Sequence, residues 1–214
     1  TELMNSIKMD KSPGFVLTQN GFKNKGDYLG RGGLKQIYSS SIKDEIPLGK
    51  AVGKIEKKHR SIYVGEQKMR TFIIEPTELV YHHKRLYGMQ NEAMKMFWWS
   101  AYGMNPFEGG VNRIARKLNR FKFKFMLDVI RWDRKASWMK YVYDLREKYT
   151  KDDELKEWVR NNVINSFVVL PNGDLIYKTW GNNSGSATTT GDNILGMSLI
   201  LCVMLFKLAK GNRW

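Results

Sequence analysis

The sequence predicts a mixed α+β fold in which antiparallel strands pack against helices. Aromatic residues alternate with lysines over 121–127, and this period of two indicates a half-buried strand. Two β-rich runs, 167–170 and 175–178, flank an Asn172-Gly173 turn, which is a strong hairpin signal. Over 77–103, apolar residues recur at three- and four-residue spacing and predict a helix. Together these segments give a mixed architecture with antiparallel elements.

The composition restricts the class of protein. The chain has 214 residues, 42% of them hydrophobic and 13% aromatic, which excludes a disordered chain. Lys and Arg number 36 against 21 Asp and Glu, and the net charge of +15 indicates a polyanionic partner, either nucleic acid or an anionic membrane surface. A single cysteine, Cys202, excludes a disulfide framework and a cysteine-based zinc site. The chain begins at Thr1 without a signal-peptide pattern, so we expect an internal piece of a longer protein.

The first half of the chain is expected to be largely irregular before its first strand. Residues 1–35 are rich in glycine and turn residues. A basic stretch over 43–70 contains eight Lys/Arg and four acids, and it leads into a strand at 70–74. The helix predicted over 77–103 is broken by Asn105-Pro106 and Gly109-Gly110.

The second half is expected to hold several helices around the hairpin. A short basic helix over 111–120 precedes the predicted strand, which ends at Asp128. Helices over 135–149 and 151–164 have nearly balanced charges, which we interpret as solvated faces. A Gly/Ser/Thr-rich loop over 181–190 leads into a final apolar helix. Its apolar run, 194–206, is shorter than the roughly 20 residues of a membrane-spanning helix, so we expect a buried core helix and no transmembrane segment.

Two carboxylates follow the predicted strand, Asp128 and Asp133. A carboxylate at the exposed end of a buried strand is a suitable Mg²⁺ ligand, because Mg²⁺ prefers hard oxygen donors. A second carboxylate five residues later, past a tight turn, lies near enough to contact the same substrate. The alternative is that both residues serve as turn or cap residues, which is common for so short a pattern.

The loop before the final helix carries a second candidate site. Its glycines and small hydroxyl residues allow the backbone to approach a sugar or a phosphate closely. Thr189 and Asn193 are four residues apart, so on a helix they share one face and can bind one ligand. The alternative is an ordinary Ser/Thr N-cap at the start of a core helix.

A third candidate lies where the basic stretch meets its strand. Lys68 and Arg70 are two residues apart and project to the same side of a strand, where Arg70 is able to make bidentate contacts to a polyphosphate. The alternative is a solvated charged face. His59, His82 and His83 lack metal-ligand spacing, and we expect surface or core roles for them.

Four short segments occur in order along the chain: Lys11-Ser12-Pro13-Gly14, then Lys43-Asp44-Glu45 with Lys68-Met69-Arg70, then Asp128 with Asp133, and finally Ser184-Gly185 with Thr189 and Asn193. More than 50 residues separate Arg70 from Asp128, and again Asp128 from Ser184. In this order the segments resemble motifs G, F, A and B of the RNA-dependent RNA polymerases of positive-strand RNA viruses, in particular the picornavirus-like and astrovirus-like branch.

The resemblance implies a right-hand polymerase fold that comprises fingers and an incomplete palm. Residues 1–120 would form a fingers-like region with the template and NTP motifs, and 121–150 the palm strand and helix of motif A. Residues 151–180 would form a fingers-like helix and hairpin, and 181–214 the loop and truncated helix of motif B.

The implied reaction is template-directed synthesis of RNA from NTPs, with Mg²⁺ or Mn²⁺ as cofactor. Asp128 would hold the metal ions. The resemblance assigns the ribose 2′-hydroxyl to Asp133, Ser184, Thr189 and Asn193, and the triphosphate to Lys43, Lys68 and Arg70. It assigns the template strand to Ser12, Gly14 and Gly185. RNA and NTPs are thus the implied partners, with no DNA, and the implied location is the host cytoplasm at viral replication complexes.

The sequence departs from the family in one respect. The Gly-Asp-Asp hairpin of motif C should follow motif B, and neither this hairpin nor the thumb is present before Trp214. We therefore expect either a fragment or a polymerase whose remainder is a second polypeptide, and we expect this piece alone to be inactive.

Two alternatives come from other classes. A non-catalytic, sequence-independent single-stranded RNA-binding protein would explain the charge and the aromatic residues. It would not explain a carboxylate, Asp128, at the end of an otherwise acid-free stretch over 111–127. A membrane-surface protein would need a basic amphipathic helix, and 111–120 is too short to serve alone.

Overall fold

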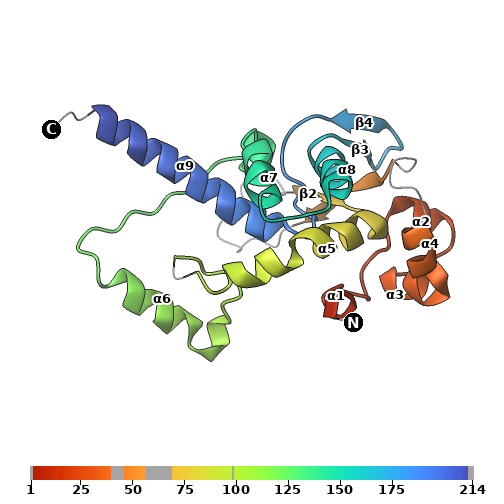
Figure 1. The fold of residues 1–214 in the computed structure, drawn as a ribbon, viewed down its shortest axis with the longest axis horizontal. Coiled ribbons are helices and arrows are strands. Elements are labelled where there is room, and N and C mark those ends of the chain that lie inside the picture. The colour runs from red at the N-terminus through yellow and green to blue at the C-terminus, as the bar shows by residue number, and fades with distance from the viewer. Residues whose placement is uncertain (1, 40–45, 56–68, 98, 212–214) are drawn as a thin grey trace.

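A four-stranded sheet lies at the centre of the computed structural model, which describes residues 2–39, 46–55, 69–97 and 99–211 (Figure 1). Its order is β2-β1-β3-β4, and helices pack around it, which confirms the mixed α+β class. The strands are β1 (Leu48–Ile55), β2 (Met69–Ile74), β3 (Ser166–Val169) and β4 (Leu175–Lys178).

The sheet combines both strand directions. β1 pairs antiparallel with β2, and β3 pairs antiparallel with β4 across the predicted turn, in which Gly173 has a φ of +94°. These two pairs are antiparallel elements of the expected kind, whereas β1 and β3 pair in parallel, with Gly49 opposite Val168, which the sequence did not indicate. β1 itself was not predicted, because its glycines and lysines hide the alternation typical of a strand. Gly49 lacks a Cβ where one would lie 2.9 Å from Ile73 Cγ2, so β1 fits closely against β2.

The N-terminal region is helical where an irregular segment was expected over 1–35. Its elements are α1 (Glu2–Asn5), α2 (Phe15–Gln19), α3 (Lys25–Tyr28), a π-helical turn (Leu29–Gly33) and α4 (Leu34–Ser39). These helices are too short to produce a helical period in the sequence. Together with Tyr81 from later in the chain, they enclose a small core of Ile7, Leu17, Tyr28, Leu29, Ile37 and Tyr81.

The main core lies between α5 (Thr77–Met94), α7 (Met139–Glu147) and α8 (Asp153–Ile164). Helix α5 begins after Pro76 as expected but ends well before residue 103. The core residues include Leu79, Tyr87, Met139, Val142, Tyr143, Leu155, Val159 and Val163. Burial of these side chains removes them from water, which is the main stabilising contribution to such a core.

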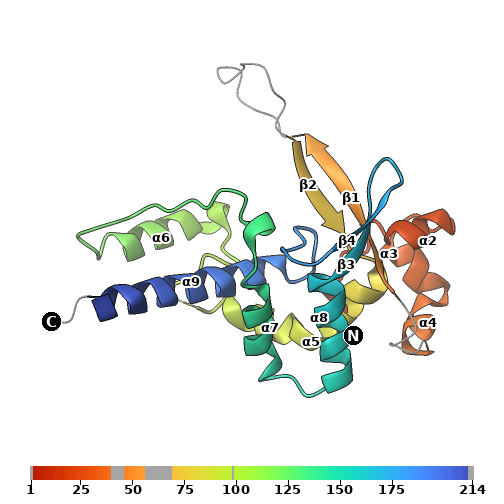
Figure 2. The ribbon, with the colours of Figure 1, turned by 90° about the horizontal axis from the view of Figure 1, so that it is seen from above.

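The segment between α6 (Gly110–Leu118) and α7 contradicts the sequence prediction. Residues 121–127 form no strand and are exposed, with Phe125 89% and Met126 96% accessible. No strand of the described residues pairs with this segment, so its alternating pattern has no sheet on which to bury one face. In Figure 2 it extends away from the sheet beside α6.

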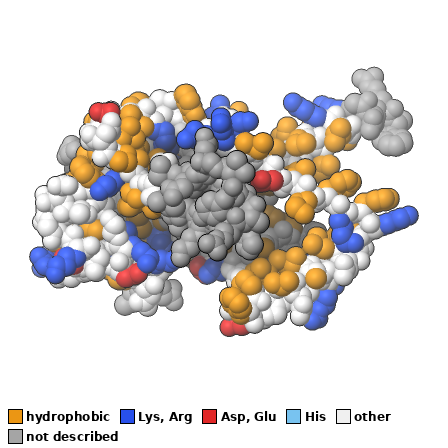
Figure 3. All heavy atoms as spheres, turned by 180° about the vertical axis from the view of Figure 1, so that it is seen from behind, with side chains coloured by type: hydrophobic (Ala, Val, Ile, Leu, Met, Phe, Trp, Pro, Cys, Tyr) orange, Lys and Arg blue, Asp and Glu red, His pale blue; other side chains and the backbone are white. Residues whose placement is uncertain are grey.

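Helix α9 (Thr189–Gly211) is longer than the apolar run in the sequence. Leu195, Leu199 and Ile200 are partly buried against the main core, whereas Val203 and Phe206 are exposed, so the expectation of a buried core helix is met only in part, by the inner half. The outer half and α6 project from the same side, where hydrophobic side chains mix with Lys and Arg (Figure 3). Within the described ranges, α9 is the one helix long and apolar enough to cross a membrane, a test that core helices also pass.

Candidate nucleotide and template site

The loop that precedes α9 lies directly against the turn that carries Asp133. The Ser184 hydroxyl donates a hydrogen bond to Asp133 Oδ2 at 2.5 Å, and the backbone N–H of Asn182 donates to the backbone carbonyl of Asp133 at 2.9 Å. Gly181 permits this approach, because its φ is +91° and a Cβ would lie 2.8 Å from the same carbonyl. Two of the predicted ribose residues, Asp133 and Ser184, are therefore in direct contact.

Asn193, on the first turn of α9, is held by side chains from both segments. Its Oδ1 accepts a hydrogen bond from Trp132 Nε1 at 2.8 Å and another from Asn182 Nδ2 at 2.8 Å. These contacts bring Asn193 to the same cluster as Asp133, because Trp132 precedes Asp133 in the chain and Asn182 contacts both.

Thr189, the remaining predicted ribose residue, uses its hydroxyl within the loop. Thr189 Oγ1 lies 2.6 Å from the Asn183 carbonyl and 3.0 Å from the Ser186 carbonyl, and it is the donor in both contacts. A hydroxyl has one proton to donate. Thr189 therefore holds the loop onto the helix start by donating to its carbonyls, which differs from an N-cap, where the side chain accepts from backbone N–H groups.

A hollow of about 370 Å³ lies beside this cluster. One wall is formed by Thr71, Phe72 and Ile73 of β2, directly after the predicted triphosphate residue Arg70. The opposite wall carries Asp133, Asn182 and Ser184. Burial lowers the pKa of the lining residue Lys178 to about 8, and its ammonium donates to two backbone carbonyls. The lining residues are Thr71, Phe72, Ile73, Asp133, Arg134, Ile176, Tyr177, Lys178, Thr179, Trp180, Asn182 and Ser184.

Asp128 lies in the exposed segment before this cluster and not at the end of a strand. Neither an ion pair nor a hydrogen bond involves its carboxylate within the described part of the chain. The same residues contain no group of three or more His, Cys, Asp or Glu side chains arranged to hold a metal ion. Asp128 is thus available as one oxygen ligand, but the described residues do not complete a metal site.

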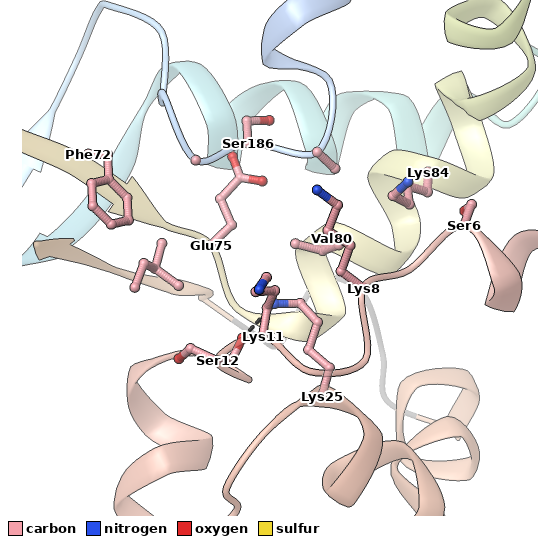
Figure 4. A pocket seen from close by; sticks show the side chains of 13 residues that line it. Ser6, Lys8, Lys11, Ser12, Lys25, Phe72, Glu75, Val80, Lys84 and Ser186 are labelled. Atoms are coloured by element: carbon pink, nitrogen blue, oxygen red, sulfur yellow. Dashed lines mark hydrogen bonds between the residues drawn. The ribbon is translucent and has the colours of Figure 1, made fainter. Parts of the chain in front are cut away.

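A second hollow, of about 510 Å³, lies on the other side of the loop over 181–188, which precedes α9 and which we call the motif B loop (Figure 4). It brings together Ser12 and Gly185, two of the predicted template residues, although 173 positions separate them in the sequence. Four lysines, Lys8, Lys11, Lys25 and Lys84, line it, and its one acidic lining residue is Glu75. This surplus of positive charge in a concave surface favours a polyanion.

The lysines of this hollow are in different environments. Lys25 donates to the Ser12 carbonyl at 2.5 Å and fixes the first loop (Figure 4). Burial lowers the pKa values of both Lys25 and Lys84. At Lys84, the charge of Glu92 raises the pKa, whereas the charges of Lys8 and Lys95 lower it further. An anion bound between Lys84 and Lys8 would relieve the repulsion of these like charges.

Two of the predicted template residues are glycines that the packing requires. Gly14 has a φ of +114°, and a Cβ there would lie 2.7 Å from Pro76 Cα. Gly185 approaches β2 so closely that a Cβ would lie 2.1 Å from the Ile73 carbonyl oxygen. Each glycine therefore lets its loop pass against the segment 73–76 at the end of β2.

Glu75 and His83 contact buried side chains of the motif B loop, and neither contact was predicted from the sequence. Glu75 accepts from Asn183 Nδ2 at 3.3 Å and lies 3.6 Å from His83 Nδ1. Burial raises the pKa of Glu75, but hydrogen bonds and charge from His83, Asn183 and Ser186 outweigh burial and lower it overall. His83 also contacts the hydroxyls of Ser186 at 3.2 Å and Thr188 at 3.1 Å. The core role expected for His83 is confirmed.

A buried ion pair fixes the start of α9. Arg146 Nε lies 2.8 Å from Asp192 Oδ1, and both side chains are fully buried. Arg146 also donates to Asn91 and Gln90 of α5, and Asp192 accepts from Thr188 at 2.7 Å. The solvated face expected for the helix over 135–149 is therefore wrong at Arg146, because the charge balance of a helix does not reveal which charges it buries.

The predicted triphosphate residues are placed only in part. Lys43 and Lys68 lie outside the described residues. The backbone of Arg70 pairs with Lys54 of β1 in the sheet.

Comparisons with known proteins were made on both sequence and structure. The family profile described as "Viral RNA-dependent RNA polymerase" matches residues 1–212. The chain is 34% identical over 106 residues to non-structural polyprotein 1AB of Human astrovirus-1, a match that covers 42% of the chain and 7% of that polyprotein. It is 26% identical over 189 residues to the genome polyprotein of Pea seed-borne mosaic virus (strain DPD1), which covers 82% of the chain and 5% of that polyprotein.

The structure is similar to solved polymerases. It matches the insertion-loop deletion mutant of the RNA-dependent RNA polymerase of a human picorbirnavirus with a TM-score of 0.61 and 13% identity. The match covers 89% of this chain and 40% of the solved chain, so the present chain corresponds to under half of that protein. The likeness confirms the fold expected from the resemblance, as part of a polymerase domain.

Proposed function

Because the chain belongs to the family of viral RNA-dependent RNA polymerases, we propose that it supplies the nucleotide and template sites of an enzyme that synthesises RNA from NTPs on an RNA template. Such synthesis replicates and transcribes a viral genome. The observation that carries the proposal is the hydrogen bond between Ser184 and Asp133. It joins the two segments that the resemblance assigns to the NTP ribose, at the edge of a hollow large enough to hold part of a nucleotide.

The ribose would be recognised by Asp133, Ser184 and Asn193. A 2′-hydroxyl both donates and accepts a hydrogen bond, and it is the group that separates NTPs from dNTPs. The free oxygen of Asp133 is an acceptor, since Ser184 occupies Oδ2, and the Asn193 amide nitrogen is a donor. Thr189 would act indirectly by holding the loop. An NTP would meet both partners, whereas a dNTP would leave both unpaired.

The triphosphate would be neutralised by basic residues at the start of β2. Arg70 leads directly into the wall of the 370 Å³ hollow. Lys43 and Lys68 are proposed for the same role on the resemblance alone. An arginine suits this position because its guanidinium binds phosphate oxygens in pairs.

The template strand would pass through the 510 Å³ hollow, between the first loop and the motif B loop. Ser12, Gly14 and Gly185 border or support its path. The ammonium groups of Lys8, Lys11 and Lys84 would contact its phosphates, which makes binding tolerant of sequence and sensitive to salt. The two hollows lie on either side of the segment 73–75, so a template base and an NTP would meet above it.

Asp128 would contribute to holding Mg²⁺ or Mn²⁺. A bound divalent ion supplies positive charge that stabilises the transferring phosphoryl group and activates the attacking hydroxyl. Because two such ions need more than one carboxylate, further ligands would come from the rest of the polymerase, either a second chain or the continuation of this one. We place the activity in the host cytoplasm at viral replication complexes, since the related polyproteins are viral.

Primer extension tests this proposal. The chain alone, supplied with a primed RNA template, NTPs and Mg²⁺ or Mn²⁺, should incorporate no nucleotide. A complete polymerase that contains it should extend the primer in a template-dependent manner. If the complete protein binds RNA but extends no primer under any of these conditions, the non-catalytic RNA-binding alternative replaces the proposal.

A further inference from the structure

Trp132 precedes Asp133, and its indole contacts Asn193 of α9. The proposed function assigns no role to this contact. Its indole nitrogen is a donor only, so the atom 2.8 Å away on Asn193 must be the carboxamide oxygen. Asn182 Nδ2 donates to the same oxygen at 2.8 Å. Both acceptor sites of Asn193 Oδ1 are therefore occupied by neighbouring side chains.

This arrangement determines the orientation of the Asn193 amide. With Oδ1 engaged, Nδ2 has no hydrogen-bond partner among the described residues. It is also not one of their fully buried polar atoms without a partner, so it is accessible to a ligand. A rotation of the amide by 180° would place an NH₂ group against two donors, which is unfavourable. Asn193 is thus held with its donor available to a ligand.

Trp132 is itself held rigidly. Its ring lies 4.7 Å from that of Trp138, measured between centroids, and Trp138 fits against Gly196 of α9, where a Cβ would lie 2.2 Å from the indole. Arg131, the residue before Trp132, is the one non-glycine residue of the described chain with a positive φ, at 57°. Such a conformation is unfavourable for a residue with a Cβ and persists where the surroundings enforce it, often at functional sites.

We propose that Trp132 is a positioning residue for discrimination between NTPs and dNTPs. Its indole N–H fixes Asn193 so that Nδ2 donates to the ribose 2′-oxygen, while Asp133 accepts the 2′-hydroxyl proton. Trp132 does not contact the nucleotide in this role. The inference rests on the proposed function and adds to it the group that orients the ribose-reading amide.

The test uses a complete polymerase that contains this chain, with kcat/KM measured for NTPs and for dNTPs on one template. Trp132→Phe removes the N–H donor and retains an aromatic ring. Loss of one hydrogen bond should lower the NTP-to-dNTP selectivity about 5- to 10-fold. The kcat for NTPs should change less than about 3-fold. Trp99→Phe is the matched control, because Trp99 is partly exposed and stacks on Phe97 far from the cluster in sequence.

A second variant separates hydrogen bonding from packing. Replacement of Trp132 by benzothienylalanine keeps the two fused rings and substitutes sulfur for N–H, so selectivity should fall as it does in Trp132→Phe. Unchanged selectivity in the benzothienylalanine protein, or an equal loss in Trp99→Phe, would overturn the inference. A wild-type enzyme that makes RNA but shows no selectivity would overturn it as well. Absence of any RNA synthesis by the wild type would instead contradict the proposed function itself.

Discussion

The hydroxyl of Ser184 donates to the carboxylate of Asp133 at 2.5 Å, across 51 positions of sequence. The bond joins the turn after the exposed segment 121–128 to the loop before α9. It occupies one carboxylate oxygen of Asp133 and leaves the other for a ligand. The contact orients Asp133 before any ligand binds, and in the proposed ribose site this would reduce the ordering that binding requires.

Ser184→Ala should weaken this arrangement in the complete polymerase. Without the donor, the Asp133 carboxylate is free to rotate, so we expect kcat/KM for NTPs to fall about 10-fold and selectivity against dNTPs to fall with it. Ser198→Ala is the matched control, because the Ser198 hydroxyl donates to Ile194 within its own helix. Steady-state incorporation kinetics provide the measurement. Equal effects of the two substitutions would show that the Asp133 contact has no special role.

Arg146→Met should destabilise the fold strongly. The substitution leaves Asp192 buried without its partner, and breaking a buried ion pair in this way costs about 3–5 kcal/mol. Arg160→Met is the control, because Arg160 pairs with Asp144 and Glu147 at the surface, where such pairs contribute about 1 kcal/mol or less. Urea unfolding followed by circular dichroism gives both values. Similar losses for the two variants would contradict the anchoring role of Arg146.

Acid should destabilise the chain partly through His82. Burial, aided by the charge of Arg85, lowers the pKa of His82 to about 4 from its usual 6.5. The unfolded chain therefore binds the proton first, and stability is lost as the pH falls from 6.5 towards 4, by at most about 3 kcal/mol. His82→Phe keeps the ring contact with Trp158 and removes the titration. The free energy of unfolding should then depend less on pH across this window, and an unchanged dependence would exclude His82 as a source.

Lys84→Gln should weaken RNA binding without altering its sequence tolerance. If Lys84 neutralises one template phosphate, its loss should reduce the slope of log affinity against log salt concentration by about 0.7. Lys151→Gln is the control, because Lys151 is exposed and lies outside the hollow. Fluorescence anisotropy with single-stranded RNA at several salt concentrations provides the slopes. Equal slopes for wild type and Lys84→Gln would exclude the phosphate contact.

Local patterns predicted those elements whose signals are contained in a few neighbouring residues. The Asn172-Gly173 hairpin, the strand ending at Ile74 and helix α8 were predicted close to their observed limits. The alternation over 121–127 was misleading, because a period of two describes a strand only when a partner strand is present. β1 was missed for the converse reason, since tertiary pairing imposes an extended conformation on a glycine-rich segment.

The candidate site was predictable as a set of positions but not as a geometry. The residues that would contact ligands, such as Asp133 and Asn193, lie in recognisable spacings. The residues that hold them show no such spacing: Glu75 lies between β2 and α5, and His83 and Arg146 lie on helices whose sequence resembles any half-buried helix. Their role depends on contacts across 46 to 108 positions of sequence, and such contacts leave no local pattern.

Template-dependent incorporation by a complete polymerase carrying Asp128→Asn tests the central claim most directly. The change keeps the size of the side chain and removes the negative charge that a divalent cation requires. Asp153→Asn serves as the control, because Asp153 is exposed at the start of α8. We predict that Asp128→Asn lowers the rate of NTP incorporation at least about 1,000-fold, with RNA affinity unchanged, whereas Asp153→Asn extends primers at the wild-type rate. Wild-type incorporation by the Asp128→Asn enzyme would contradict the claim that this chain provides part of a polymerase active site.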